Sequence, residues 1–214
     1  MEGGGEPNLE SSMSKQLYVR NALFTGAQPI DLNACVGTNG GPYNLIDYAR
    51  GYARATARLT ESLKADSLWV DVVVYPLVFN ARHASELYLK HHVHLLPHLY
   101  DEKLKPKGTH RLLDNWKLVR SLVERGAELD DENPLDPTGD LAVETDRVLQ
   151  DLVEVDPSGE AFRFPWARDQ SRFLQDTNII NVRVFESAMQ LLFEAFEYWD
   201  DIAFRILDAR EDYA

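Results

Sequence analysis

The most regular hydrophobic pattern in the sequence lies near its C-terminal end. Between Thr177 and Ala209, apolar residues recur at alternating steps of three and four positions; they are Val182, Phe185, Met189, Leu192, Phe196, Trp199, Ala203 and Ile206. Residues at this spacing lie on one face of an α-helix. The pattern predicts a long helix over about Thr177 to Ala209 whose apolar face is buried in a core.

Four further segments have helical spacing or helix start and stop signals. The predicted helices run from Tyr43 to Lys64, from near Leu68 to Pro97 with a kink at Pro76, from a capping Thr109 to Gly126, and from Asp140 to Val155. Cys35–Pro42 is predicted to be a loop, and Ala161–Trp166 an extended segment because it contains a proline. No internal repeat is present. The sequence predicts an all-α up-and-down bundle with two long helices and two or three shorter ones.

Residues 1–16 are predicted to be a flexible leader before a single domain over 17–214. The leader has no basic segment followed by an apolar one, so it is not expected to be a secretory signal. The most apolar stretch, Leu68–Phe79, contains Asp71, so no membrane span is expected. The single cysteine, Cys35, excludes an internal disulfide and fits a cytoplasmic location.

The charged residues are unevenly distributed along the chain, whose net charge is −13. Glu128–Glu160 contains twelve acidic residues and one basic residue. Arg82–Arg125 contains nine basic and five acidic residues. The overall charge disfavours a protein that simply coats nucleic acid, and only the second region is suited to contact phosphate.

The segment from Tyr75 to His98 concentrates titratable side chains. It carries five of the six histidines in the chain, and His110 follows soon after. Arg82, Glu86 and Lys90 are spaced four residues apart, which places them on one stripe of the second predicted helix. On a solvated helix face, the stripe would be an ion-pair ladder that contributes roughly a few tenths of a kcal/mol per pair.

The alternative is that this stripe lines a cleft. Arg82 has apolar neighbours in the sequence. In such surroundings a guanidinium group has to be paired or face a cleft, because burying an unpaired charge is costly. Arginine, lysine and an imidazole together are the groups needed to bind and cleave a phosphodiester. The candidate catalytic residues are Arg82, His83, Glu86, Lys90 and His110.

Three other histidines raise the possibility of a metal site. His91, His94 and His98 lie close together on an ideal helix, in a set that would suit zinc or nickel. Pro97 distorts the turn before His98, and no carboxylate stands at a supporting position nearby in the sequence. We therefore expect no metal and no other cofactor, and keep a histidine-based metal-dependent hydrolase as a third hypothesis.

Three motifs carry a resemblance to a known superfamily. They are R-H-A-S-E-L-Y-L-K from Arg82 to Lys90, T-H-R-L-L from Thr109 to Leu113, and F-R-F-P from Phe162 to Pro165. Together they resemble bacterial proteins of the HEPN superfamily that carry R-H-x-x-E-L-x-L-K, H-x-L and F-R-Y-P motifs. The resemblance implies a HEPN-like helical bundle, and a homodimer or a subunit of a defence complex.

The same resemblance implies an activity. Many HEPN proteins are metal-independent endoribonucleases of toxin–antitoxin systems or antiviral defence, in which the RNA 2′-hydroxyl attacks the adjacent phosphorus. Arg82 and Lys90 would stabilise the phosphoryl charge, His83 or His110 would transfer protons, and Glu86 would orient a partner. The chain departs from the usual signature, an arginine followed a few residues later by a histidine, because Arg82 directly precedes His83. The alternative function is therefore a non-catalytic HEPN module that binds a protein or nucleic acid.

Overall fold

The computed structural model describes residues 22–41, 43–100 and 108–211. It divides the chain into two units, Met1–Pro42 and Tyr43–Ala214. The described part of the first unit has two short 3-10 turns, Ala22–Phe24 and Ile30–Leu32, and an irregular segment over 35–41 that agrees with the predicted loop. The leader predicted over residues 1–16 lies outside the described residues.

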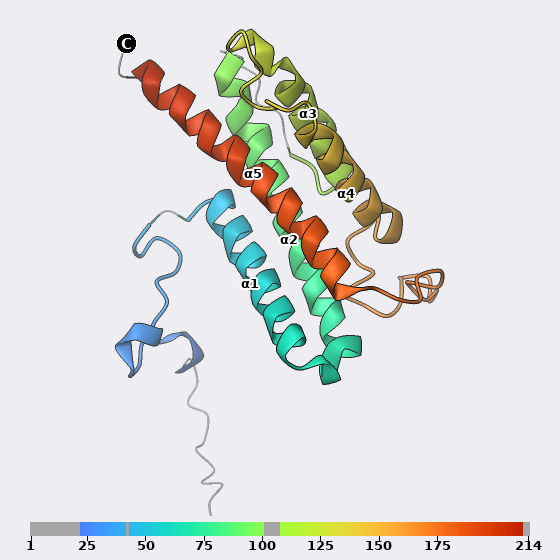
Figure 1. The fold of residues 1–214 in the computed structure, drawn as a ribbon. Helices are drawn as coiled ribbons and strands as arrows, with labels where there is room; N and C mark the ends of the chain where they lie inside the picture. Colours follow the sequence, from blue (N-terminus) through green and yellow to red (C-terminus); the bar gives the residue numbers. More distant parts are fainter. Residues whose placement is uncertain (1–21, 42, 101–107, 212–214) are drawn as a thin grey trace, which may run out of the picture. The chain divides into compact units, whose positions relative to one another are not determined.

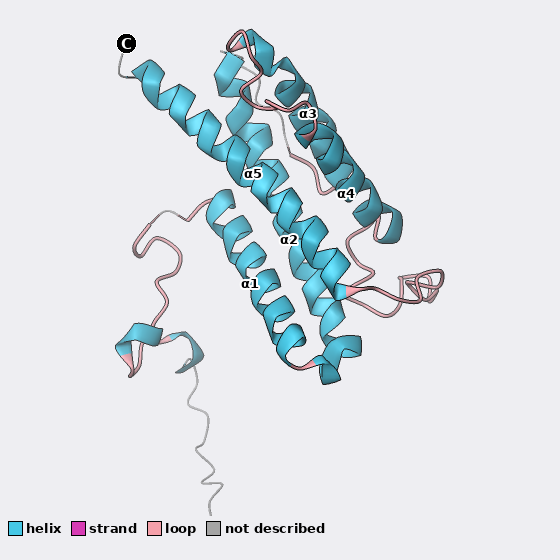
Figure 2. Cartoon of the chain, viewed as in Figure 1, coloured by secondary structure: helices cyan, strands magenta, loops and turns pink. Residues whose placement is uncertain are grey.

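The second unit is a bundle of helices (Figures 1 and 2). Its α-helices are α1 (Leu45–Ala65), α2 (Val70–Leu95), α3 (Leu112–Glu124), α4 (Leu141–Val155) and α5 (Val182–Glu211). The described ranges contain no strand, only an isolated bridge between Trp166 and Arg172. The predicted all-α fold class is confirmed. None of the helices in these ranges combines the length and the apolar character needed to cross a bilayer.

The bounds of the first two helices follow from local signals in the sequence. Asn44 caps α1, since its side chain accepts a hydrogen bond from the Ile46 amide at 3.1 Å while its own amide donates to Asp47 at 2.8 Å. The helix α2 continues through Pro76 and ends at Leu95, before a 3-10 turn, Leu96–Tyr100, that contains Pro97. The predicted end of this helix at Pro97 is therefore close to the observed one.

The helix α2 lies at the centre of the bundle and packs against α1, α3 and α5. From α5, the predicted apolar face supplies Phe196 and Trp199, which have no exposed surface. The indole rings of Trp199 and Trp116 stack with centroids 5.8 Å apart and join α5 to α3. Phe196 and Trp199 are thus core as the helical spacing predicted, whereas Phe185 is only partly buried and packs against the core.

Three local predictions were wrong. Thr109 does not cap α3: the helix begins at Leu112, and the Thr109 hydroxyl instead accepts a hydrogen bond from the Arg111 amide at 3.1 Å. Residues 161–163 form a turn rather than an extended segment, in which the amides of Arg163 and Phe164 both donate to the Glu160 carbonyl. The last helix begins at Val182 rather than near Thr177.

Candidate functional site

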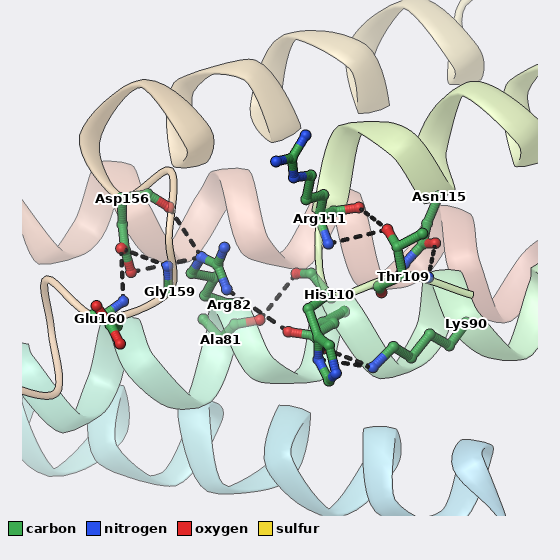
Figure 3. Close-up of polar contacts among 12 residues, drawn as sticks. Ala81, Arg82, Lys90, Thr109, His110, Arg111, Asn115, Asp156, Gly159 and Glu160 are labelled. Carbon is green, nitrogen blue, oxygen red and sulfur yellow. Dashed lines mark hydrogen bonds and ion pairs between the residues drawn. The ribbon is translucent and has the colours of Figure 1, made fainter. Parts of the chain in front are cut away.

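Glu86 and Lys90 of the predicted stripe both contact His110, which lies just before α3. Figure 3 shows Lys90 beside the His110 ring. One carboxylate oxygen of Glu86, Oε1, accepts a hydrogen bond from Lys90 Nζ at 2.7 Å and lies 3.0 Å from His110 Nδ1. Lys90 Nζ and His110 Nδ1 are 3.4 Å apart. Two cationic or proton-donating groups therefore converge on a single carboxylate oxygen.

The members of this cluster differ sharply in their exposure. The His110 side chain is 92% exposed, whereas the Glu86 side chain is only 10% exposed. Burial alone would raise the pKa of Glu86, but the hydrogen bonds from Lys90 and His110 outweigh burial and lower that pKa. Glu86 is therefore an ionised, fixed acceptor that holds one ring nitrogen of His110 and leaves the other nitrogen accessible to a ligand.

The loop that carries His110 is held in place by Asn115, a residue that the sequence analysis did not single out. Asn115 is fully buried, its side-chain amide donates to the Thr109 carbonyl at 2.8 Å, and its side-chain oxygen accepts from the Thr109 amide at 2.8 Å. Gly108 packs on Lys90, because a Cβ atom at that position would lie 2.9 Å from Lys90 Cγ. An asparagine six residues after Thr109 was the only local sign of this arrangement in the sequence.

Arg82 lies beneath the cluster and is only 5% exposed. Its Nε donates to the Asp156 carbonyl at 3.2 Å and lies 3.5 Å from the carboxylate of the same residue. Its Nη1 is 3.8 Å from Glu86 Oε2, and its buried Nη2 has no hydrogen-bond partner among the described residues. Arg82 thus meets the expectation that its guanidinium is paired, and its contacts bridge α2 to the residue that follows α4.

Asp156 is a second residue of the site that the sequence analysis missed. One carboxylate oxygen accepts from the amides of Gly159, Glu160 and Ala161 at 2.8, 3.0 and 3.1 Å. These bonds fix the turn after α4 against Arg82 (Figure 3). No signal in the sequence pointed to this role of Asp156, because a contact with a residue 74 positions away leaves no local pattern.

His83 lies apart from this cluster. Its half-buried ring meets the Tyr52 ring of α1 edge-on at 4.5 Å and stacks on Phe79 at 5.8 Å. Burial lowers the pKa of His83, so the ring is favoured in its neutral form. Of the candidate residues, the structure brings together Arg82, Glu86, Lys90 and His110, and places His83 against aromatic rings.

The remaining histidines of the segment do not form a shared site. His91 Nε2 lies 2.7 Å from Asp200, which also pairs with Arg50, whereas His94 and His98 are exposed and His92 is fully buried. No group of three or more histidine, cysteine or acidic side chains in the described ranges is arranged to hold a metal ion.

Comparisons of the chain with protein-family models, with curated proteins and with solved structures found no match in any of the three. The features that point to a function are therefore the geometry of the site and the motifs in the sequence. All four residues that the structure brings together, Arg82, Glu86, Lys90 and His110, belong to those motifs.

Proposed function

We propose that the chain is a HEPN-like, metal-independent endoribonuclease of the toxin or phage-defence type, acting as a homodimer or within a larger complex. The observation that carries the proposal is the exposed ring of His110, with its Nδ1 held 3.0 Å from the ionised Glu86 carboxylate. A carboxylate that holds one ring nitrogen orients the imidazole and leaves the other nitrogen to accept a proton. This is the arrangement that a general base requires.

The chemistry assigned to these residues is an attack by the RNA 2′-hydroxyl on the adjacent phosphorus. His110 takes the hydroxyl proton at Nε2, the new bond forms between the 2′ oxygen and phosphorus, and the bond to the 5′ oxygen breaks. Water supplies the proton for the departing 5′ oxygen. The Lys90 ammonium group, which lies 3.4 Å from the His110 ring, stabilises the negative charge that grows on the phosphoryl oxygens.

Arg82 takes a positioning role in this proposal. It is buried and lies 3.8 Å from the Glu86 carboxylate, on the side of that carboxylate opposite the oxygen that His110 and Lys90 share. It also fixes the turn after α4 through Asp156. We assign no proton transfer to His83, whose ring packs against Tyr52 and Phe79.

The test is incubation of the purified chain with total RNA, with and without EDTA. The wild-type chain should cleave RNA equally in both conditions, leaving 2′,3′-cyclic phosphate ends. His110→Ala should reduce cleavage by about 10²-fold or more, since general base catalysis contributes roughly 10² to 10⁴. His94→Ala is the matched control, because it removes an exposed histidine of α2 that lies outside the cluster.

Equal cleavage by the wild type and by His110→Ala would overturn the assignment of the base. Loss of wild-type cleavage in EDTA, restored by an added divalent ion, would instead favour a metal-dependent hydrolase. Each variant should be checked for an unchanged circular dichroism spectrum and melting temperature, so that a loss of fold is not mistaken for a loss of chemistry.

One observation favours a second candidate, a non-catalytic HEPN module that binds a protein or a nucleic acid. The Arg82 guanidinium is buried under the turn after α4, so it does not face a bound phosphate directly. In such a module, Lys90 and His110 would contact phosphate without catalysing its transfer. RNA binding without cleavage by the wild type, weakened in His110→Ala, would establish this function instead.

A further inference from the structure

A groove lies between α1 and α5, helices that Figure 1 shows side by side. Its volume is about 530 Å³, and its α1 wall is built from small side chains, among them Ala53, Ala57 and Thr60. Met189 and Phe193 of α5 supply apolar surface on the other wall. Small residues on one wall allow another helix to approach closely, as in helix-in-groove recognition.

The charged residues of the groove all carry the same sign. Four acidic side chains line it, Glu186, Glu194, Glu197 and Asp201, and no lysine or arginine is among its lining residues in the described part of the chain. Two of the acids are neutralised, because Lys64 pairs with Glu186 at 2.7 Å and Arg50 pairs with Glu197 at 2.6 Å. These two ion pairs join α1 to α5 along the groove.

The other two acids have no cationic partner among the described residues. Glu194 accepts a hydrogen bond from Gln190 at 2.8 Å, and neither Glu194 nor Asp201 makes an ion pair with a described residue. Both residues are exposed. A negatively charged rim around an apolar floor favours a ligand that is positively charged and apolar on adjacent faces.

An exposed aromatic residue extends the same face of α5. Phe204 follows Asp201 by three residues, which places it on the helix face that carries Asp201 and Glu197. Its side chain is 53% exposed. A large exposed aromatic side chain that continues an apolar groove is typical of a protein-binding surface.

We propose that this α1/α5 groove binds a basic amphipathic helix of a partner protein. The apolar side chains of that helix would lie against Ala53, Ala57 and Phe193, and its lysine or arginine side chains would pair with Glu194 and Asp201. A second copy of the chain is the poorer occupant, because two acidic grooves would repel each other and the chain carries a net charge of −13. The site is distinct from the cluster around Glu86.

The test uses an 18-residue designed peptide of leucine and lysine with helical spacing, labelled with a fluorophore, and measures its binding by fluorescence anisotropy. The wild-type chain should bind this peptide, and a version with every lysine replaced by glutamate should not bind. The variant Glu194→Lys/Asp201→Lys should weaken binding at least about tenfold, since it replaces two attractive charge contacts with two repulsive ones. Asp130→Lys/Asp131→Lys is the matched control, because it makes the same change in net charge at exposed positions outside the groove.

A second variant separates the groove from general electrostatic attraction. Ala57→Trp fills the groove at an exposed position of α1 without changing the charge, and it should also weaken binding at least about tenfold. Equal weakening by the control pair, unchanged binding by Ala57→Trp, or no binding by the wild type would each overturn the proposal. RNA cleavage by these variants should equal that of the wild type, so a failure of this inference is distinguishable from a failure of the proposed activity.

Discussion

His110 Nδ1 and Glu86 Oε1 lie 3.0 Å apart, although 24 residues separate them in the sequence. The carboxylate belongs to the centre of α2, and the imidazole to the residues before α3. The contact places a buried ionised group behind an exposed titratable one, and it defines where a ligand can reach the site.

The first prediction concerns this contact. Glu86→Gln keeps the size of the side chain but removes the charge that holds the His110 ring and the Lys90 ammonium group. RNA cleavage should fall by about 10²-fold, because the imidazole is no longer held in the tautomer that a base requires. Glu194→Gln, an exposed acid of α5, is the control and should leave the rate of cleavage unchanged. Full activity of Glu86→Gln would show that the contact is not used.

The second prediction concerns the turn that covers Arg82. Gly159 has a φ of +79°, and a Cβ atom there would clash with Arg82 Nη1. Gly139 has a φ of +77° and nothing within 4 Å of its Cβ position. Gly139→Ala should lower the free energy of unfolding by about 1 kcal/mol from backbone strain. Gly159→Ala should lower the free energy of unfolding by about 1 to 3 kcal/mol more than Gly139→Ala does, since the Arg82 guanidinium has to move as well. Equal losses in urea titrations would mean that the turn does not press on Arg82.

The third prediction concerns the pH dependence of stability. Burial lowers the pKa of His92 to about 4 in the folded chain, from 6.5 as the ordinary value. Between these values the unfolded state binds the additional proton, so the free energy of unfolding falls as the pH drops from 6.5 towards 4 and changes no further below that range. Over this range, the protonation of His92 lowers the free energy of unfolding by about 3 kcal/mol in total.

A variant isolates the contribution of His92. Its ring packs against those of Tyr88, Phe196 and Trp199, and neither ring nitrogen makes a hydrogen bond with a described residue. His92→Phe should therefore fold, and its stability should fall less steeply than that of the wild type between pH 6.5 and 4. His98→Ala, at an exposed position, should retain the wild-type slope. Parallel stability curves for the wild type and His92→Phe would contradict the assignment.

The fourth prediction concerns α1. Gly51 is an exposed residue within this helix, and nothing lies within 4 Å of its Cβ position. Gly51→Ala should raise the free energy of unfolding by about 0.5 to 1 kcal/mol, because alanine loses less backbone entropy in a helix. Ala57→Gly, at another exposed position of α1, should lower it by a similar amount in the same urea titration. A destabilised Gly51→Ala would mean that this position contacts something outside the described chain.

The sequence by itself determined the helices and the faces that they bury. The apolar spacing that includes Phe196 and Trp199 correctly predicted which face of α5 is buried in the core. Helical periodicity is a local property, so the spacing of side chains along the sequence reveals it directly. The same reasoning placed Arg82, Glu86 and Lys90 on one stripe of α2. Thr109 was misjudged because a hydroxyl near a helix start can bond to the loop as readily as to the helix.

Only the tertiary structure decided which of these side chains meet and which are accessible. It joined His110 to Glu86, buried Arg82 under the turn formed by Asp156, and placed His83 beside the aromatic ring of Tyr52. These outcomes depend on how α1, α3 and the turn after α4 pack around α2. Contacts between residues far apart in the chain are set by the packing of whole elements, and the local spacing of residues carries no record of them.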